Sequence, residues 1–534
     1  MEPCHHNICS EGEEDMKTGK ILILSVLALA WLAGDAGAVD FKISGQWMFG
    51  ISGAETTMVH KYRNAQGQSI TNKQSDYLQG QQRLRTLIEA IVSENVSGAV
   101  QFQMGTPKTL WGKANGINGG AALGADSTDM LVVRQAYLDW MVPAADIKVR
   151  MGIQPVSLPD AAGGSIVLQS NVAGVTANWR INDILGLTAL WIRPLNDNYT
   201  GEDGRDANYL DNIDLFGLTV PVKLDGLSLT PWAMYGIRGK NALSGYRGYN
   251  GGNAYSTVDG NLNFTLNPSP ELSGRNDISK SSRPYGSLFW AGLPIKLTMF
   301  EPLNFELDLI YGYVESMGRF DAVKYGGADW QTPQVKRSST RREGFVAKAL
   351  LEYKMDWGAP GILGWYGSGD QGNPKNGSQR MPSLVGWGNF TSFMGDGNRH
   401  TWAFRDINGT YAGTWGIGAQ LRDFSFLEDL EHTFKAVWWG GTNSPSMAKY
   451  MNSAYAWQSG EFQYDGPYMT TNDGLLEFNL DTNYKMYENL NVNLTLGYIA
   501  NFMDNATWNK AGKHNTSFSR QDLWKAMLVF EYSF

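Results

Sequence analysis

The spacing of its alternating segments is the feature that most constrains how this chain folds. Eighteen segments alternate apolar and polar residues with a period of two, which is the pattern of half-buried β-strands. The gaps between them alternate as well: long polar gaps, such as 53–80 and 368–408, take turns with short ones, such as Asn182-Asp183 and Tyr487-Glu488. A transmembrane barrel places its long loops at one end and its short turns at the other. A soluble sandwich has no reason to sort its loops in this way.

The predicted fold is therefore all-β, a transmembrane antiparallel up-and-down β-barrel. Its strands are expected at 41–52, 81–93, 95–105, 130–142, 145–154, 171–181, 184–193, 212–223, 226–238, 285–299, 303–316, 343–356, 359–367, 409–423, 430–441, 473–486, 489–503 and 520–534. The segments 184–193 and 359–367 are the weakest, and without one hairpin the barrel would have sixteen strands. An even number places both chain ends beside the short turns, which we assign to the periplasm.

The segment 1–38 indicates export from the cytoplasm. Lys17 and Lys20 precede an apolar run, 21–32, and Ala36-Gly37-Ala38 has the small-residue spacing of a cleavage site. The sequence thus predicts an N-terminal extension with a cleaved signal peptide over 1–38 and one barrel domain over 39–534. Both cysteines lie in the part that is removed, so we expect no disulfide in the mature chain. The acidic residues before Met16 do not suit a leader, and they favour Met16 as the start.

The composition favours strands over helices, and the sequence shows no clear nucleic-acid, metal or catalytic site. The chain has 62 Gly, 18% charged residues and a formal net charge of −8, so it shows no basic surface for nucleic acid. Carboxylates between 202 and 214 could hold Ca²⁺, but their spacing fits a solvated loop better. His432 has no Ser, Asp or Cys at a catalytic spacing. We therefore expect no metal, no cofactor and no enzymatic activity.

Charged residues on the polar faces of the strands are the candidates for the pore. A lysine or arginine facing lipid near the membrane centre costs about 2–4 kcal/mol, so these side chains should face the interior. Basic residues come mainly from the first five strands and carboxylates from later ones, which would set a field across the lumen. The simpler alternative is that they only solvate the interior. The candidates on strands are Arg83, Arg85, Glu89, Arg134, Lys148, Arg150, Glu306, Asp308, Glu477, Asp481, Lys525 and Glu531. Asp160 is added to them by the resemblance described next.

Two short motifs carry a family resemblance. Arg134-Gln135-Ala136-Tyr137, a short turn and Arg150-Met151-Gly152 look like a porin hairpin. With the leader, the loop pattern and the terminal phenylalanine, the chain resembles the Gram-negative homotrimeric outer-membrane porins, most closely those of sulfate-reducing deltaproteobacteria. The resemblance implies a loop, 156–171, that folds inward and narrows the lumen. It departs from the family in one respect, because Asp160 is the only carboxylate in this loop.

The resemblance also implies partners. The terminal aromatics Phe530, Tyr532 and Phe534 match the signal read by the barrel-assembly machinery. A homotrimer in an outer membrane with lipopolysaccharide is expected, with Gly45 and Gln135 as outward residues suited to protein contacts. The leading functional hypothesis is a water-filled channel for passive diffusion of ions and small hydrophilic solutes. The alternative is a channel selective for sugars or organic acids.

Overall fold

The computed structural model describes residues 39–55, 58–63, 69–71, 77–111, 120–121, 131–196, 212–239, 272–276, 283–324, 334–394, 409–450, 468–510 and 519–534. The predicted leader, 1–38, lies outside these residues, as do all of the candidate calcium ligands between 202 and 214 except Asp214.

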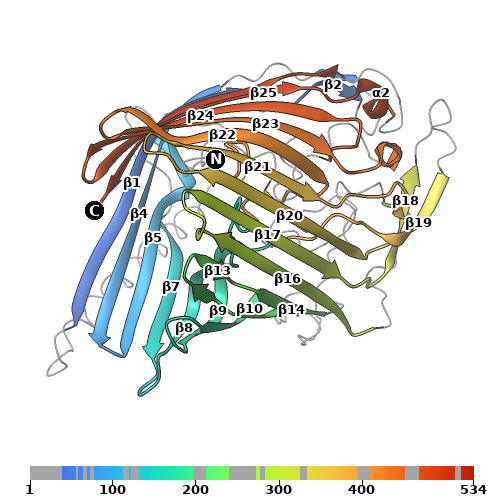
Figure 1. Ribbon diagram of the computed structural model, residues 1–534. Coiled ribbons are helices and arrows are strands. Elements are labelled where there is room, and N and C mark those ends of the chain that lie inside the picture. The colour runs from blue at the N-terminus through green and yellow to red at the C-terminus, as the bar shows by residue number, and fades with distance from the viewer. Residues whose placement is uncertain are drawn as a thin grey trace, which may run out of the picture.

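The described strands form a closed antiparallel barrel of eighteen wall strands. The wall is built from β1 (Asp40–Glu55), β4 (Tyr77–Ser93), β5 (Val96–Trp111), β7 (Leu131–Met141), β8 (Ile147–Ser157), β9 (Gln169–Arg180), β10 (Gly186–Asn196), β11 (Asn212–Thr219) continued by β12 (Val222–Leu224), β13 (Leu227–Leu229) continued by β14 (Trp232–Gly239), β16 (Tyr285–Leu297), β17 (Leu303–Val314), β20 (Arg342–Tyr353), β21 (Ala359–Gly367), β22 (Thr414–Leu427), β23 (Leu430–Gly441), β24 (Gly474–Tyr487), β25 (Leu490–Asn501) and β27 (Leu523–Ser533). Each wall strand pairs with the next along the chain, and β27 pairs with β1. In Figure 1 the blue first strands accordingly lie beside the red last ones.

Smaller elements lie in the long connections. They are β2 (Val59–Arg63), β3 (Ser69–Thr71), β6 (Gly120–Ala121), β15 (Leu272–Asn276), β18 (Arg319–Lys324), β19 (Gln334–Ser339), β26 (Ser519–Arg520) and the short helices η5 (Pro374–Asn376), η7 (Pro445–Tyr450) and α2 (Asn505–Trp508). In the described part of the chain, no helix has the length and apolar character needed to cross a membrane.

The sequence prediction of eighteen antiparallel strands is confirmed, and the sixteen-stranded alternative is wrong. The main difference is at β22, which was expected to begin at residue 409 but begins at Thr414. Tyr411 and Gly413 have φ angles of 58° and 75°, so the backbone turns there instead of extending. The same strand continues to Leu427, which leaves only Glu428 and Asp429 between β22 and β23.

The two faces of the wall differ in chemistry. Large apolar side chains point outward along every part of the barrel, with Phe41 63% exposed, Ile362 58% and Leu309 44%. The side chains of their strand neighbours Lys42 and Asp308 point to the other side. Soluble monomers rarely expose a continuous apolar surface of this size, whereas a transmembrane barrel requires one.

Phe534 closes the barrel against the first strand. Its backbone N–H donates to the Gly45 carbonyl at 3.1 Å, and the Gly45 N–H donates to the Phe534 carbonyl at 2.8 Å. A Cβ on Gly45 would lie 2.3 Å from the Phe534 ring and 2.7 Å from the Arg85 carbonyl oxygen. The position of the Phe534 ring thus requires a glycine at position 45. This contact within the chain explains Gly45 without a neighbouring subunit. Gln135, the other expected contact, donates to Asn171 at 3.2 Å.

This contact leads to a prediction about Gly45→Val. The added side chain should displace the Phe534 ring and cost about 1–3 kcal/mol of barrel stability, as overpacking usually does. We expect a lower fraction of the compact, heat-modifiable form on SDS gels. Gly98→Val is the matched control, because a Cβ at Gly98 meets only one atom, the Tyr137 carbonyl oxygen at 3.7 Å. Equal folded fractions for the two variants would refute this role of Gly45.

Candidate channel interior

The interior of the first strands carries a set of arginines held by glutamines. Arg85 Nε donates to Gln103 Oε1 at 2.8 Å, and Arg134 donates to the same oxygen at 3.4 Å. Arg83, nearly buried, lies within hydrogen-bond distance of Gln46. Arg85 and Arg134 are partly exposed, so their charges face the interior space. Because neutral amides hold these guanidinium groups, the positive charge is positioned without being cancelled by the glutamines.

A second basic group is balanced by a carboxylate that the sequence analysis did not single out. Arg150 makes a bidentate pair with Asp139 at 2.7 and 2.8 Å, and Lys148 Nζ lies 2.8 Å from the same residue. The guanidinium carbon of Arg150 lies 3.8 Å from the centre of the Tyr137 ring. Asp139 stands two residues after Tyr137 on the same face of β7, so period-two alternation could have indicated it.

The opposite part of the wall carries buried ions. Asp308 on β17 and Lys348 on β20 are fully buried, with Lys348 Nζ 3.1 Å from Asp308 Oδ2. Glu306 is 8% exposed and Glu477 is fully buried. Glu306 accepts from Lys296 at 2.6 Å. These carboxylates point inward, but Asp308 and Glu477 are fully buried and lie away from open water in this structure.

Asp308 and Lys348 are buried because the connection between β8 and β9 covers them. The backbone N–H groups of Ala161 and Ala162 donate to the Asp308 carboxylate at 2.9–3.2 Å. Lys348 donates to the Gly164 carbonyl, and Trp232 on β14 donates to the Pro159 carbonyl at 3.1 Å. The segment 158–168, which we call the inner loop, therefore crosses from its own hairpin to the wall at β14, β17 and β20. Asp160 within it is exposed.

A second connection packs on the inner loop. The sequence did not predict that it lies inside the barrel. Residues 380–394, between β21 and β22, form the part that we call the partner loop. Arg342 donates to the carbonyls of Arg380 and Met381, and Trp290 Nε1 donates to the Pro382 carbonyl at 2.9 Å. Farther along, Lys435 Nζ donates to the Phe390 carbonyl at 2.6 Å. The partner loop thus covers the wall from β16 to β23.

The end of the partner loop accounts for two more predicted residues. Lys525 on β27 is 3% exposed and donates to the Ser392 carbonyl, with its Nζ 4.5 Å from the Phe393 ring centre. Glu477 accepts from Asn479 at 2.8 Å, and Asn479 accepts from the Ser392 N–H at 3.1 Å. In this structure Lys525 and Glu477 therefore support the partner loop and are not exposed to open water.

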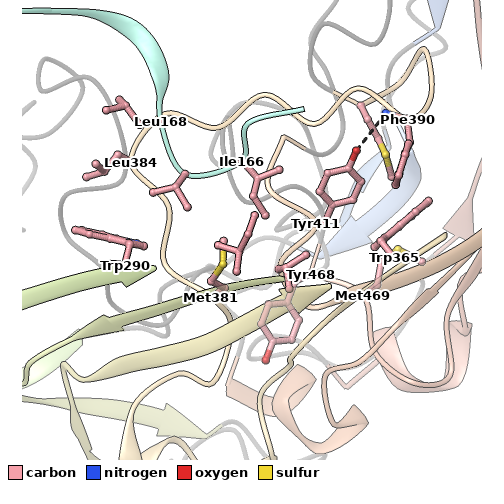
Figure 2. Packing of buried hydrophobic residues seen from close by; sticks show 14 of the residues in the cluster. Ile166, Leu168, Trp290, Trp365, Met381, Leu384, Phe390, Tyr411, Tyr468 and Met469 are labelled. Carbon is pink, nitrogen blue, oxygen red and sulfur yellow. Dashed lines mark hydrogen bonds between the residues drawn. The ribbon is translucent and has the colours of Figure 1, made fainter. Parts of the chain in front are cut away.

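Tyr411 joins the two loops. Its hydroxyl donates to the Gly163 carbonyl of the inner loop at 2.7 Å and accepts from the Asn389 and Phe390 N–H groups at 3.1 Å. Figure 2 shows Tyr411 between Phe390 and Ile166, with Trp365 and the strands of the wall below. Burial raises the pKa of Tyr411, so the phenol keeps the proton that it donates to Gly163. The buried apolar cluster inside the barrel contains residues of both loops, including Ile166, Leu168 and Met381.

Open space remains beside the first strands. A hollow of about 340 Å³ lies against β8, β9 and β10 next to the start of the inner loop. Lys148, Arg150, Gln154, Thr176, Asn178 and Thr188 are among its lining residues. Hydrogen-bonding and positively charged groups therefore face this space, in contrast with the apolar cluster across the barrel.

The predicted site residues fall into three groups. Partly exposed on interior positions of the wall are Arg85, Glu89, Arg134, Lys148, Arg150, Asp481 and Glu531. Buried are Arg83, Glu306, Asp308, Glu477 and Lys525. Asp160 is exposed on the inner loop. The structure thus brings most of the partly exposed candidates together on β4 to β8, and it leaves Asp308 of β17 and Glu477 of β24 beneath the loops.

Within the described ranges, no group of three His, Cys, Asp or Glu residues is placed to hold a metal ion. His432 lies 2.8 Å from the Thr482 hydroxyl and packs against Phe424, with ring centres 5.2 Å apart.

Comparison with solved structures returns proteins of Pseudomonas aeruginosa, among them the outer membrane protein OprD. OprD aligns with 11% identity over 94% of this chain and 95% of that chain, with a TM-score of 0.46. OccK11 (OpdR) aligns with 11% identity over 93% and 96%, with a TM-score of 0.46. OpdL aligns with 14% identity over 93% and 99%, with a TM-score of 0.44. No protein-family model and no curated protein matches the sequence. The fold assignment rests on the closed strand pairing itself.

Proposed function

We propose that this chain forms a water-filled channel in the outer membrane of a Gram-negative cell, through which ions and small hydrophilic solutes diffuse passively. The observation that carries the proposal is the closed barrel with an apolar outer face and charged interior groups. Closure satisfies every ladder hydrogen bond without an exposed sheet edge, which a protein in lipid needs. The cleaved leader over 1–38, recognition of Phe530, Tyr532 and Phe534 by the assembly machinery and a homotrimeric state belong to the same proposal. So does the resemblance to porins of sulfate-reducing deltaproteobacteria.

The inner loop and the partner loop define the path in this proposal. They fill the interior beside β14 to β24, so water and solutes pass along the wall of β4 to β9. There the path meets Arg85, Arg134 and Lys148, which are partly exposed. The inner loop then acts as the constriction that the sequence resemblance implied, although it carries its only acidic group at Asp160.

Liposome swelling tests the proposed function. Vesicles containing the refolded protein should swell in small sugars and amino acids, with rates that fall as solute mass rises. Vesicles that hold the heat-denatured protein are the control. Swelling no faster than in the control would contradict a diffusion channel.

A second candidate, a solute-selective channel on the same barrel, is favoured by the hollow beside Lys148 and Arg150. Its volume of about 340 Å³ suits one small solute, and its lining offers charge and hydroxyl groups. Block of single-channel current by a micromolar solute would favour this candidate, since a general pore is not blocked at that concentration.

Charge reversal tests the basic wall. In the double variant Arg85→Glu/Arg134→Glu two fixed positive charges become negative, so the reversal potential in a salt gradient should shift toward cation selectivity. The matched control is Arg193→Glu. Arg193 pairs with Asp214 at 2.8 Å beside the exposed Trp191, on the outer face of the barrel. An equal reversal potential for the double variant and the parent would refute the placement of these arginines beside the path.

A further inference from the structure

Two hollows lie one above the other on the outside of β16, β17 and β20, which run side by side (Figure 1). The first is an apolar groove of about 340 Å³ whose lining includes Ala291, Leu293, Leu309, Tyr311 and Phe345. Leu309 is 44% exposed and Phe345 48%, so this face is open to the surroundings of the barrel. The small Ala291 lies between the larger side chains and gives the groove its depth.

The second hollow lies toward the long loops and is basic. Its volume is about 510 Å³, and its lining includes Arg283, Arg319, Arg341, Tyr313 and Glu315. Arg283 pairs with Glu315, and Arg341 pairs with Glu343. Arg319 is exposed and pairs with no carboxylate among the residues that the structure describes. Three guanidinium groups and the Glu315 carboxylate thus surround one hollow, a lining that suits an anionic group.

The groove and the basic hollow follow one another along the strands. On β17, Tyr311 lines the groove and Tyr313 lines the hollow. Phe345 on β20 lines the groove, and Arg341, the residue directly before β20, lines the hollow. The two are four residues apart, or about 13 Å along an extended chain. The Tyr311 hydroxyl donates to Glu343 at 2.6 Å, at the boundary between the two. An amphiphile with an anionic head and a hydrocarbon chain matches this order of surfaces.

We propose that this face binds a phosphorylated glycolipid of the outer leaflet, with one acyl chain in the groove and a phosphate in the arginine hollow. The inference rests on the proposed function, because it requires the long-loop end to face the outer leaflet. Arginine suits this ligand, since its planar fork donates two parallel hydrogen bonds to phosphate and stays charged at any working pH. A zwitterionic phospholipid places its phosphate beside a cation of its own and fits the surplus of arginine less well.

Native mass spectrometry of the refolded protein with diphosphorylated lipid A tests the proposal. The triple variant Arg283→Gln/Arg319→Gln/Arg341→Gln should bind roughly tenfold more weakly or worse, as expected from the loss of charge-assisted hydrogen bonds. Ala291→Phe, which fills the groove, should also weaken binding. The parent should bind lipid A that lacks phosphate as weakly as the triple variant binds the intact lipid. Arg193→Gln, an outer-face arginine on β10, is the matched control and should bind like the parent.

Several outcomes overturn the proposal. One is an affinity for lipid A in the triple variant and in Ala291→Phe that equals that of the parent. Another is a loss of affinity in Arg193→Gln as large as that in the triple variant. A third is binding of inorganic phosphate alone as tight as that of lipid A. A change of oligomeric mass in Ala291→Phe would assign this face to contacts between copies instead. Single-channel conductance is recorded on the same samples. A conducting protein that fails these binding tests loses only this inference, whereas a protein that does not conduct loses the proposed function.

Discussion

Replacing Pro159–Val167 of the inner loop with a short Gly-Ser linker is expected to raise single-channel conductance severalfold. In the proposed path this loop occupies the interior between its own hairpin and the wall at β17 and β20. Removing it takes away the narrowest section, and the conductance of a pore is set mainly by its narrowest section. The wall strands keep their ladder hydrogen bonds, so the heat-modifiable band on SDS gels should persist.

The matched control replaces Asn182–Ile184, in the short turn between β9 and β10, with the same kind of linker. This turn lies at the other end of the barrel and is exposed. Its replacement should leave conductance unchanged. If the inner-loop variant folds and conducts like the parent, the loop does not narrow the path.

The second large effect is expected at the buried ion pair. Asp308→Ala leaves Lys348 buried without its carboxylate, a change that typically costs about 3–5 kcal/mol. It also removes the acceptor of the Ala161 and Ala162 N–H groups. We therefore expect both a lower urea midpoint for unfolding and a higher, noisier conductance, because the inner loop loses its attachment.

The double variant Asp308→Ala/Lys348→Met separates these two effects. Removing the second charge should restore much of the urea midpoint, since no buried ion is left unpaired. The conductance should stay high, because the backbone N–H groups of the inner loop still lack their acceptor. A double variant with parent-like conductance would show that the carboxylate does not hold the loop in place.

The sequence predicts the wall of this protein well, for a physical reason. Each wall strand has one face toward the apolar outside and one toward the interior, so apolar and polar residues alternate with a period of two in every segment. Phe305, Leu307 and Leu309 on β17, for example, fall on the face opposite Asn304 and Asp308, as predicted. The short turns can also be predicted from the sequence, because a hairpin needs only a few residues between its strands.

The interior could be predicted only in part. Alternation places Asp308, Glu477 and Lys525 inside but does not reveal whether water or a loop covers them. That depends on contacts between segments far apart in the chain, such as Ala161 with Asp308 or Ser392 with Lys525. The partner loop has no periodic pattern, and Tyr411 acts through backbone groups that any sequence would supply. Asp139 could have been predicted, because the alternation of β7 places it on the inner face, two residues after Tyr137.

Whether this protein forms a channel is decided by single-channel recording of the refolded protein in a planar bilayer. We expect discrete, stable conductance steps in salt solution. The reversal potential should move toward cation selectivity in Arg85→Glu/Arg134→Glu and stay unchanged in Arg193→Glu. A folded, heat-modifiable protein that inserts into the bilayer and produces no steps would contradict it.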